Sequence, residues 1–210
     1  MRLFSFFLLV SGYCFAQHLA IGVKGAAVPT GPVEGYADSE SKRYLVGPTF
    51  EVILPWHFGI AVDALYSRFG YRTVSTDLLG GSSQTNVRAN VWQFPIVARY
   101  RFRDRLNPYV EGGVSVRSSG EIRATYSGDY VDYSGGVHLI SGSYTQDSNS
   151  TVGSVFGAGL ELGGGPHWKI SPGFRYLRWK DPLVTEYGSR GYYVRGVQNE
   201  VQISLGVTWR

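Results

Sequence analysis

Apolar and polar residues alternate with a period of two along most of the chain after residue 17. The clearest case is the C-terminal segment 201–209, in which every second residue is apolar. The apolar members of this segment are Val201, Ile203, Leu205, Val207 and Trp209. Strict alternation predicts a β-strand, because a helix would repeat its apolar residues every three to four positions. The same pattern predicts eight strands, at residues 19–27, 44–54, 58–69, 88–102, 108–117, 151–162, 168–179 and 201–209.

The connections between these strands alternate in length. Short connections at 55–57, 103–107 and 163–167 alternate with long segments at 28–43, 70–87, 118–150 and 180–196. We expect the long segments to be loops, because they are rich in Gly, Ser, Asp, Asn and Tyr and lack apolar periodicity outside 121–126. Short turns at one end and long loops at the other are typical of an up-and-down antiparallel barrel. Two alternatives stay open for 121–126 and 136–144: a hairpin that extends the barrel, or a ninth and tenth strand.

One parity of each strand is apolar and the other carries glycines and charges. The acidic residues on the polar parity are Glu51, Asp63, Glu111, Glu161 and Glu200, and the basic ones are Lys24, Arg99, Arg101, Arg117, Lys169 and Arg175. Buried charges are costly unless they are paired, and five acids nearly balance six bases. We therefore predict an ion-pair lattice that fills a narrow lumen. The alternative is a soluble barrel whose charged face is solvated.

Aromatic residues gather at both ends of the apolar stripes. Those near the short turns are Trp56, Phe58, Tyr100, Phe102, Trp168 and Trp209, and those near the long loops are Tyr44, Tyr66, Trp92 and Tyr176. Two aromatic girdles that flank an apolar band are typical of a protein surface that crosses two membrane interfaces. We predict an all-β fold, an antiparallel up-and-down transmembrane β-barrel of eight strands.

The N-terminus has the layout of a secretory signal peptide. Arg2 supplies a positive charge, residues 3–10 are mostly apolar, and the small residues Cys14 and Ala16 stand at the −3 and −1 positions of a cleavage site before Gln17. We predict a cleaved signal peptide at 1–16 and a barrel domain at 17–210; the alternative for 1–16 is a short buried helix or strand. Cleavage removes the single cysteine, so the exported chain uses no disulfide.

These features together resemble the small OmpA-type outer-membrane barrels. The segments 44–48 and 108–113 are similar to segments common in that superfamily. The resemblance implies a location in the bacterial outer membrane and folding by the outer-membrane assembly machinery. It also implies that this machinery recognises the terminal strand with Val201, Ile203, Leu205, Val207 and Trp209. Arg210 follows Trp209, which departs from a final aromatic residue.

The residues that could carry other chemistry are few. A net charge of +4 with scattered basic residues disfavours nucleic-acid binding. The isolated residues His18, His57, His138 and His167 lack the spacing of metal ligands, and we expect no cofactor. Lipid A-modifying barrels need a serine and an activating histidine at the outer edge. Only His138, near Ser141 and Ser143, is in the outer loops; we expect it to be solvated and the protein not to be an enzyme.

Four further basic residues, Lys42, Arg68, Arg88 and Arg178, fall on the apolar parity at the loop-side ends of strands. They either extend to the interface or contact phosphates of lipopolysaccharide. The sequence thus predicts a structural scaffold, or an interaction protein whose surface loops bind an unknown ligand, with outer-membrane lipid as a partner. The alternatives are a porin-like channel and, ranked lower, a lipid A-modifying barrel enzyme.

Overall fold

The computed structural model describes residues 19–31, 33–35, 38–76, 81–104, 106–163, 167–183, 185–187 and 193–209. The predicted signal peptide and His18 lie outside the described residues. Among the described residues, no helix has the length and apolar character that crossing a membrane requires.

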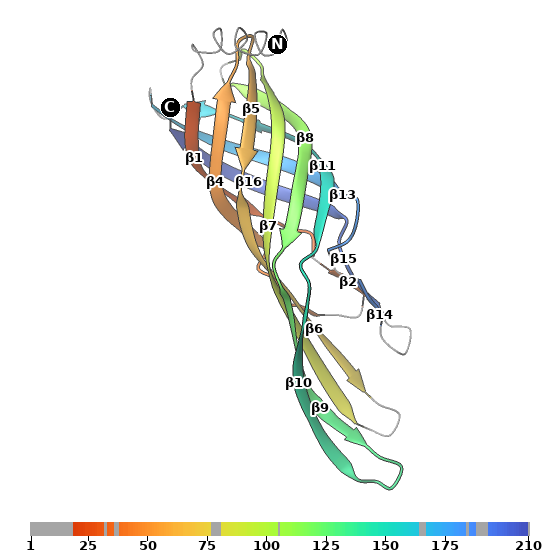
Figure 1. Cartoon of the computed structure of the whole chain (residues 1–210). Helices are drawn as coiled ribbons and strands as arrows, with labels where there is room; N and C mark the ends of the chain where they lie inside the picture. The colour runs from red at the N-terminus through yellow and green to blue at the C-terminus, as the bar shows by residue number, and fades with distance from the viewer. Residues whose placement is uncertain are drawn as a thin grey trace, which may run out of the picture.

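Eight antiparallel strands close into a barrel, with β5 and β6 counted as one (Figure 1). They are β1 (Leu19–Ala27), β4 (Tyr44–Ile53), β5 (Phe58–Asp63) with β6 (Leu65–Thr76), β7 (Ser82–Arg101), β8 (Pro108–Ser119), β11 (Ser150–Leu160), β13 (Trp168–Trp179) and β16 (Asn199–Trp209). β5 and β6 are two parts of one barrel strand that is interrupted at Ala64, since both pair with β4 and with β7. β16 pairs with β1 and closes the ring. The predicted eight-stranded antiparallel barrel is confirmed.

The open question of ten strands is decided by the pairing of β8. β9 (Ile122–Val131) and β10 (Val137–Gln146) form a hairpin that lies between β8 and β11 in the sequence. β8 nevertheless pairs directly with β11, and β9 pairs with the first part of β7. The hairpin therefore extends the barrel wall and adds no strand to the closed barrel.

The prediction that 70–87 is a loop was wrong for most of that segment, since 70–76 belong to β6 and 82–87 to β7. Within 118–150, the hairpin of β9 and β10 is one of the two alternatives that the sequence left open. β7 has 20 residues, about twice the roughly 9–11 needed to cross a bilayer, and its first part projects with β6, β9 and β10 (Figure 1). We call these four extended strands the projecting sheet. Its far part has few buried residues, so its sequence lacks the apolar alternation that reveals a half-buried strand.

Five short strands complete the described structure. β2 (Val33–Gly35), β14 (Thr185–Tyr187) and β15 (Tyr193–Gly196) form a small separate sheet near the loop-side end of the barrel (Figure 1). β3 (Asp38–Ser39) pairs with β6, and β12 (Leu162–Gly163) pairs with β13. At the opposite end, Trp56 and His57 have φ of 59° and 69° in the tight turn between β4 and β5. Two adjacent residues with positive φ suit a hairpin turn that matches the strand twist.

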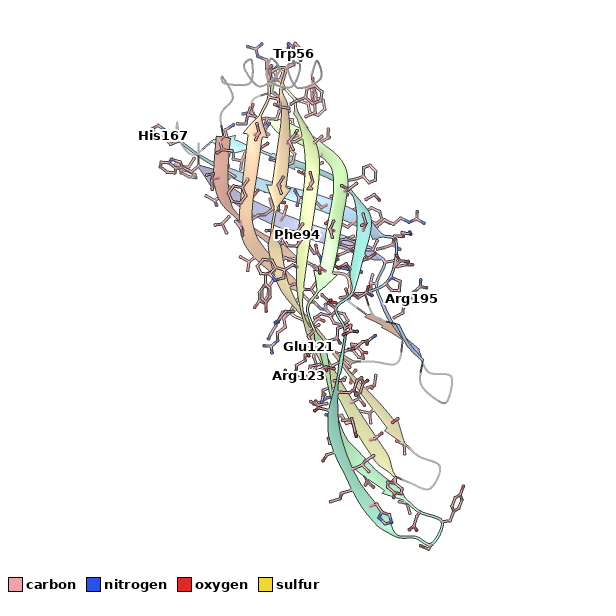
Figure 2. All side chains as sticks on the ribbon, in the orientation of Figure 1. Trp56, Phe94, Glu121, Arg123, His167 and Arg195 are labelled. Carbon is pink, nitrogen blue, oxygen red and sulfur yellow. The ribbon has the colours of Figure 1, made fainter. Side chains whose placement is uncertain are left out.

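The barrel is apolar outside and polar inside. Phe94, on β7, illustrates the outward parity and is 39% exposed (Figure 2), whereas Gln93 beside it is 3% exposed. On the outer surface, rings contact one another near both ends: Phe58 and Tyr100 lie 5.0 Å apart near the short turns, and Tyr66 and Trp92 lie 5.3 Å apart near the loops. This polarity is the one that a barrel in lipid needs.

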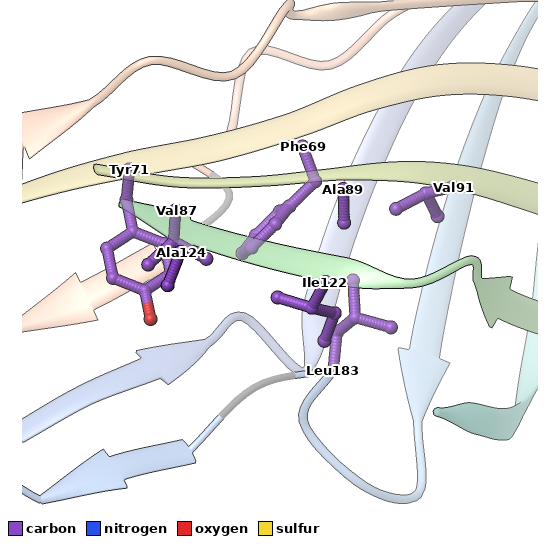
Figure 3. Packing of buried hydrophobic residues seen from close by; sticks show 8 residues of the cluster. All are labelled: Phe69, Tyr71, Val87, Ala89, Val91, Ile122, Ala124 and Leu183. Carbon is purple, nitrogen blue, oxygen red and sulfur yellow. The ribbon is translucent and has the colours of Figure 1, made fainter. Parts of the chain in front are cut away.

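A hydrophobic cluster lies where the projecting sheet leaves the barrel (Figure 3). Its members are Phe69, Tyr71, Val87, Ala89, Val91, Ile122, Ala124 and Leu183. Seven of them come from β6, β7 and β9, and Leu183 reaches them from the segment after β13. Burial of these apolar side chains stabilises the base of the projecting sheet against the loop-side mouth.

Candidate functional site: the charged lumen and the outer mouth

The charged residues of the polar parity lie inside the barrel. Ten of the eleven are at most 8% exposed, and the side chain of Lys169 is 22% exposed. They come from β1, β4, β5, β7, β8, β13, β16 and the residue after β11. Strand pairing and the inward parity bring together residues as distant in sequence as Asp63 and Arg175.

The centre of the lumen is an alternating chain of acids and bases. Asp63 accepts hydrogen bonds from Lys24 Nζ at 2.8 Å, from Arg175 Nη1 at 2.5 Å and from Thr49 Oγ1 at 2.5 Å. Arg175 also donates from Nε to Glu111. Glu111 in turn accepts from Arg99 Nη2 at 2.9 Å. Each buried charge here has an opposite charge at hydrogen-bond distance, which offsets its desolvation cost.

The chain continues toward the short turns. Arg99 Nη1 lies 3.2 Å from Glu51 Oε2, and Arg101 donates to Glu51 and, at 2.7 Å, to Glu161. Lys169 Nζ donates to the other oxygen of Glu161 at 2.9 Å. These contacts join Lys24, Arg99, Arg101, Lys169 and Arg175 to Glu51, Asp63, Glu111 and Glu161 in one network, which we call the lumen lattice.

Arg117 and Glu200 stand apart from the lumen lattice, at its loop-side end. Glu200 accepts hydrogen bonds from Gln93 Nε2 at 3.1 Å, Gln202 Nε2 at 2.7 Å and Trp179 Nε1 at 3.1 Å. Its distance to Arg117 Nη1 is 3.8 Å, too long for a hydrogen bond. The arginine head group lies over the Trp179 ring, with Cζ 4.4 Å from the centroid.

Sequence analysis missed the neutral members of the lumen. Gln93, Gln202 and Thr49 are at most 3% exposed. Tyr109 lies under the guanidinium of Arg99, with Arg99 Cζ 4.2 Å from the centroid of the Tyr109 ring. Their signal was present, because each lies on the inward parity of its strand. They carry no charge, so a pattern of charged residues on that parity does not include them.

The four predicted rim cations do not form one group. All four are exposed, but Arg178 lies on β13, between β11 and β16. Lys42 and Arg68 lie elsewhere, where the backbone N–H of Lys42 donates to the carbonyl of Arg68 on β6 at 3.0 Å. Arg88 pairs with Glu40 at 3.3 Å. The prediction missed two further exposed arginines near Arg88. Arg72 contacts the same Glu40 at 3.4 Å, and Arg123 is opposite Arg88 in the pairing of β7 and β9 (Figure 2).

His138 lies near the tip of the projecting sheet, where it contacts an aspartate. Its Nε2 is 3.0 Å from Asp132 Oδ2, and its ring stacks on Tyr130 with centroids 4.9 Å apart. Asp132 also accepts hydrogen bonds from the Ser134 hydroxyl and the Gly136 backbone. Hydrogen bonds from Ser134, His138 and Gly136 lower the pKa of Asp132 to about 2. Ser134 donates its hydroxyl to Asp132 at 2.6 Å, the same carboxyl group that His138 contacts.

The other two described histidines, His57 and His167, are on the short-turn side. His57 lies in the β4–β5 turn, and His167 stacks on Trp209 with centroids 5.7 Å apart (Figure 2). Within the described part of the chain, no three His, Cys, Asp or Glu side chains are placed to hold a metal ion.

The terminal strand presents its apolar residues outward. Ile203, Leu205, Val207 and Trp209 are 48–61% exposed, and Val201 is half-buried. Trp209 is opposite Ile21 on β1 and Trp168 on β13, so it lies at the seam where the barrel closes.

The chain matches one family of known proteins. The sequence profile of the family described as "Outer membrane protein beta-barrel domain" matches residues 17–210. No curated protein sequence matches the chain.

The chain is also similar to solved structures of other proteins, three of which follow. Ail, the attachment invasion locus protein of Yersinia pestis, solved in complex with the heparin analogue sucrose octasulfate, is 12% identical, with 92% of this chain and 96% of that chain covered and a TM-score of 0.36. The N-terminal barrel of Pseudomonas aeruginosa OprF is 13% identical (90% and 96%, TM-score 0.39). Neisserial surface protein A is 15% identical (92% and 97%, TM-score 0.40). From the match over residues 17–210 and the closed eight-stranded barrel, this chain belongs to the outer-membrane β-barrel domain family.

Proposed function

We propose that this outer-membrane barrel is a non-enzymatic surface interaction protein. The closed barrel acts as the scaffold, and the projecting sheet contacts the partner. The observation that carries this proposal is the edge of β10. It pairs with β9 on one side, and among the described residues no strand pairs with its other side.

The β10 edge has the properties of a docking strand. Its ten residues, 137–146, include no Lys, Arg, Asp, Glu or Pro. Natural edge strands usually carry such residues, because an unprotected edge pairs with other chains. Val137 and Leu139 are 65% and 88% exposed, so side chains as well as backbone groups are available. An extended peptide that adds as a further strand fits this edge.

The test is selection of a random ten-residue peptide library, displayed on phage, against the reconstituted barrel. We expect enriched peptides with alternating apolar residues. Their binding should be lost in Ser141→Lys/Ser143→Lys, because charges on an edge strand oppose pairing, and kept in Ser75→Lys, an exposed site on β6 away from this edge. Peptides that bind the edge variant as well as the wild type would overturn the proposal.

The non-enzymatic part of the proposal rests on the surroundings of His138. The geometry at Asp132 supports a role in holding the turn at the tip of the sheet. Cells that produce His138→Ala and wild-type protein should therefore have the same lipid A mass profile. A lipid A species that depends on His138 would favour the enzyme instead.

Lipopolysaccharide is the second candidate partner. The exposed arginines Arg68, Arg72, Arg88 and Arg123 lie on adjacent strands near the Tyr66–Trp92 girdle, where lipid phosphates are expected. We expect that replacing all four with Gln weakens lipopolysaccharide binding in reconstituted bilayers, whereas Arg195→Gln, on β15, does not. Unchanged binding by the folded quadruple variant would mean that these side chains only extend to the interface.

Export through a cleaved leader and recognition of the last strand belong to the same proposal. The outer-membrane form should begin at Gln17, which mass spectrometry of the purified protein measures. Its band on a gel should shift on boiling, because closed barrels resist detergent when cold. Trp209→Ala should slow the appearance of the folded band, since Trp209 lies at the closing seam.

A further inference from the structure

A cavity opens at the loop-side end of the lumen, outside the lumen lattice. It has an empty volume of about 580 Å³, which includes space open to solvent. Part of its wall is apolar: Leu45, Phe69, Val91 and Leu183 line it and are 2–6% exposed. Gln93, Arg117 and Glu200 provide polar groups in the same cavity. A largely apolar pocket with a few converging polar groups is the usual form of a small-molecule site.

Among the described polar residues that line this cavity, Arg117 has two buried nitrogens with no hydrogen-bond partner. It is 6% exposed, and neither its Nε nor its Nη2 has a hydrogen-bond partner among the described residues. Its nearest carboxylate, Glu200, is 3.8 Å from Nη1 and already accepts hydrogen bonds from Gln93, Gln202 and Trp179. A buried donor without an acceptor is destabilising, and a bound anion would supply acceptors to both nitrogens of this arginine.

The two unpartnered nitrogens define the shape of that anion. Nε–H and Nη2–H point in parallel from one edge of the planar guanidinium, a spacing that matches the two oxygens of a carboxylate. A dianion fits less well, because Glu200 lies beside the same head group. The described lumen residues comprise six bases and five acids, so one bound monoanion balances their formal charge.

We propose that this cavity binds a small amphipathic monocarboxylate. The carboxylate accepts two hydrogen bonds from Nε and Nη2 of Arg117, and the apolar body packs among Leu45, Phe69, Val91 and Leu183. The exposed residues Gly31, Lys42 and Arg43 also line the cavity, and their two cations attract an anion to its outer end. This site is independent of the β10 edge.

The test is calorimetric titration of the full barrel in phosphatidylcholine nanodiscs, which avoids detergent in the cavity. The probes are phenylbutyrate and its neutral isostere phenylbutanamide. We expect phenylbutyrate to bind the wild type at least tenfold more tightly than the amide. Arg117→Lys should weaken phenylbutyrate binding at least tenfold, because an ammonium keeps the charge and loses the parallel pair of donors. Arg195→Gln, on a strand outside the cavity, should bind as the wild type does.

A cavity-filling variant protects the test against misfolding. Val91→Phe keeps Arg117 and occupies the apolar space, so it should also abolish binding. Each variant is checked for the gel shift of a folded barrel before titration. Equal affinity for the acid and the amide in the wild type, or unchanged affinity in folded Arg117→Lys, would overturn the proposal.

Discussion

Replacing Glu111 with Gln tests whether the lumen lattice stabilises the barrel. Glu111 accepts hydrogen bonds from two buried arginines, from Arg99 Nη2 at 2.9 Å and from Arg175 Nε. The substitution keeps the shape and removes the charge. Arg99 retains Glu51 at 3.2 Å and Arg175 retains Asp63 at 2.5 Å, so neither arginine is left without a counter-charge.

The expected loss follows from this partial compensation. Removing one partner of a buried pair costs about 3–5 kcal/mol, and the retained carboxylates place Glu111→Gln at the lower end, about 3 kcal/mol. That is roughly a hundredfold change in the unfolding equilibrium, since 1.4 kcal/mol is tenfold. The free energy of unfolding is measured by urea titration of the barrel in phosphatidylcholine vesicles, followed by tryptophan fluorescence.

Two controls give the measurement its meaning. Glu121→Gln removes an exposed carboxylate and should change the free energy of unfolding by less than about 0.5 kcal/mol. Adding Arg175→Met to Glu111→Gln removes one base with one acid. The double variant should then lose less than the sum of the two single variants, by about 1 kcal/mol or more. A Glu111→Gln barrel as stable as Glu121→Gln would refute the reasoning.

The purified barrel should show no steady ohmic conductance in planar bilayers, because an ion would have to break the pairs of the lumen lattice in turn; large stable channels would favour the porin reading. Gly47→Ala should destabilise the barrel by about 1–3 kcal/mol, since the new methyl group overlaps the carbonyl oxygen of Ala64, whereas Gly25→Ala, 3.8 Å from its nearest atom, should be near neutral in the same urea titration. The stability that ionised Asp132 gives to the tip turn should be present above its unfolded pKa near 3.8 and be lost as pH falls through about 2, because its folded pKa is lowered. In NMR spectra, the amide shift of Gly136 should titrate with a midpoint near pH 2 in the wild type and should not titrate in Asp132→Asn.

The alternation of residue types was sufficient to predict the barrel. In lipid, every backbone group must pair within the barrel, and side chains meet hydrocarbon on one face and a polar lumen on the other. A strand in that position therefore has a period of two, as in 201–209. The strand extensions at 70–76 and 82–87 were missed, and the β9–β10 hairpin stayed one of two alternatives, because this constraint ends where the strands leave the bilayer. There, the long β6, β7 and β9 pairings decide the structure.

The sequence by itself determined which residues are charged and on which parity of a strand they lie, since both follow from the chain locally. Only the tertiary structure decided their partners. Asp63 and Arg175 meet across the lumen although 112 residues separate them. The same closure brings Gln93, Gln202 and Trp179 within hydrogen-bond distance of Glu200. Among the described residues, it leaves Nε and Nη2 of Arg117 without hydrogen-bond partners. Lumen geometry depends on how eight strands are staggered around the ring, a relation between distant segments that no local pattern records.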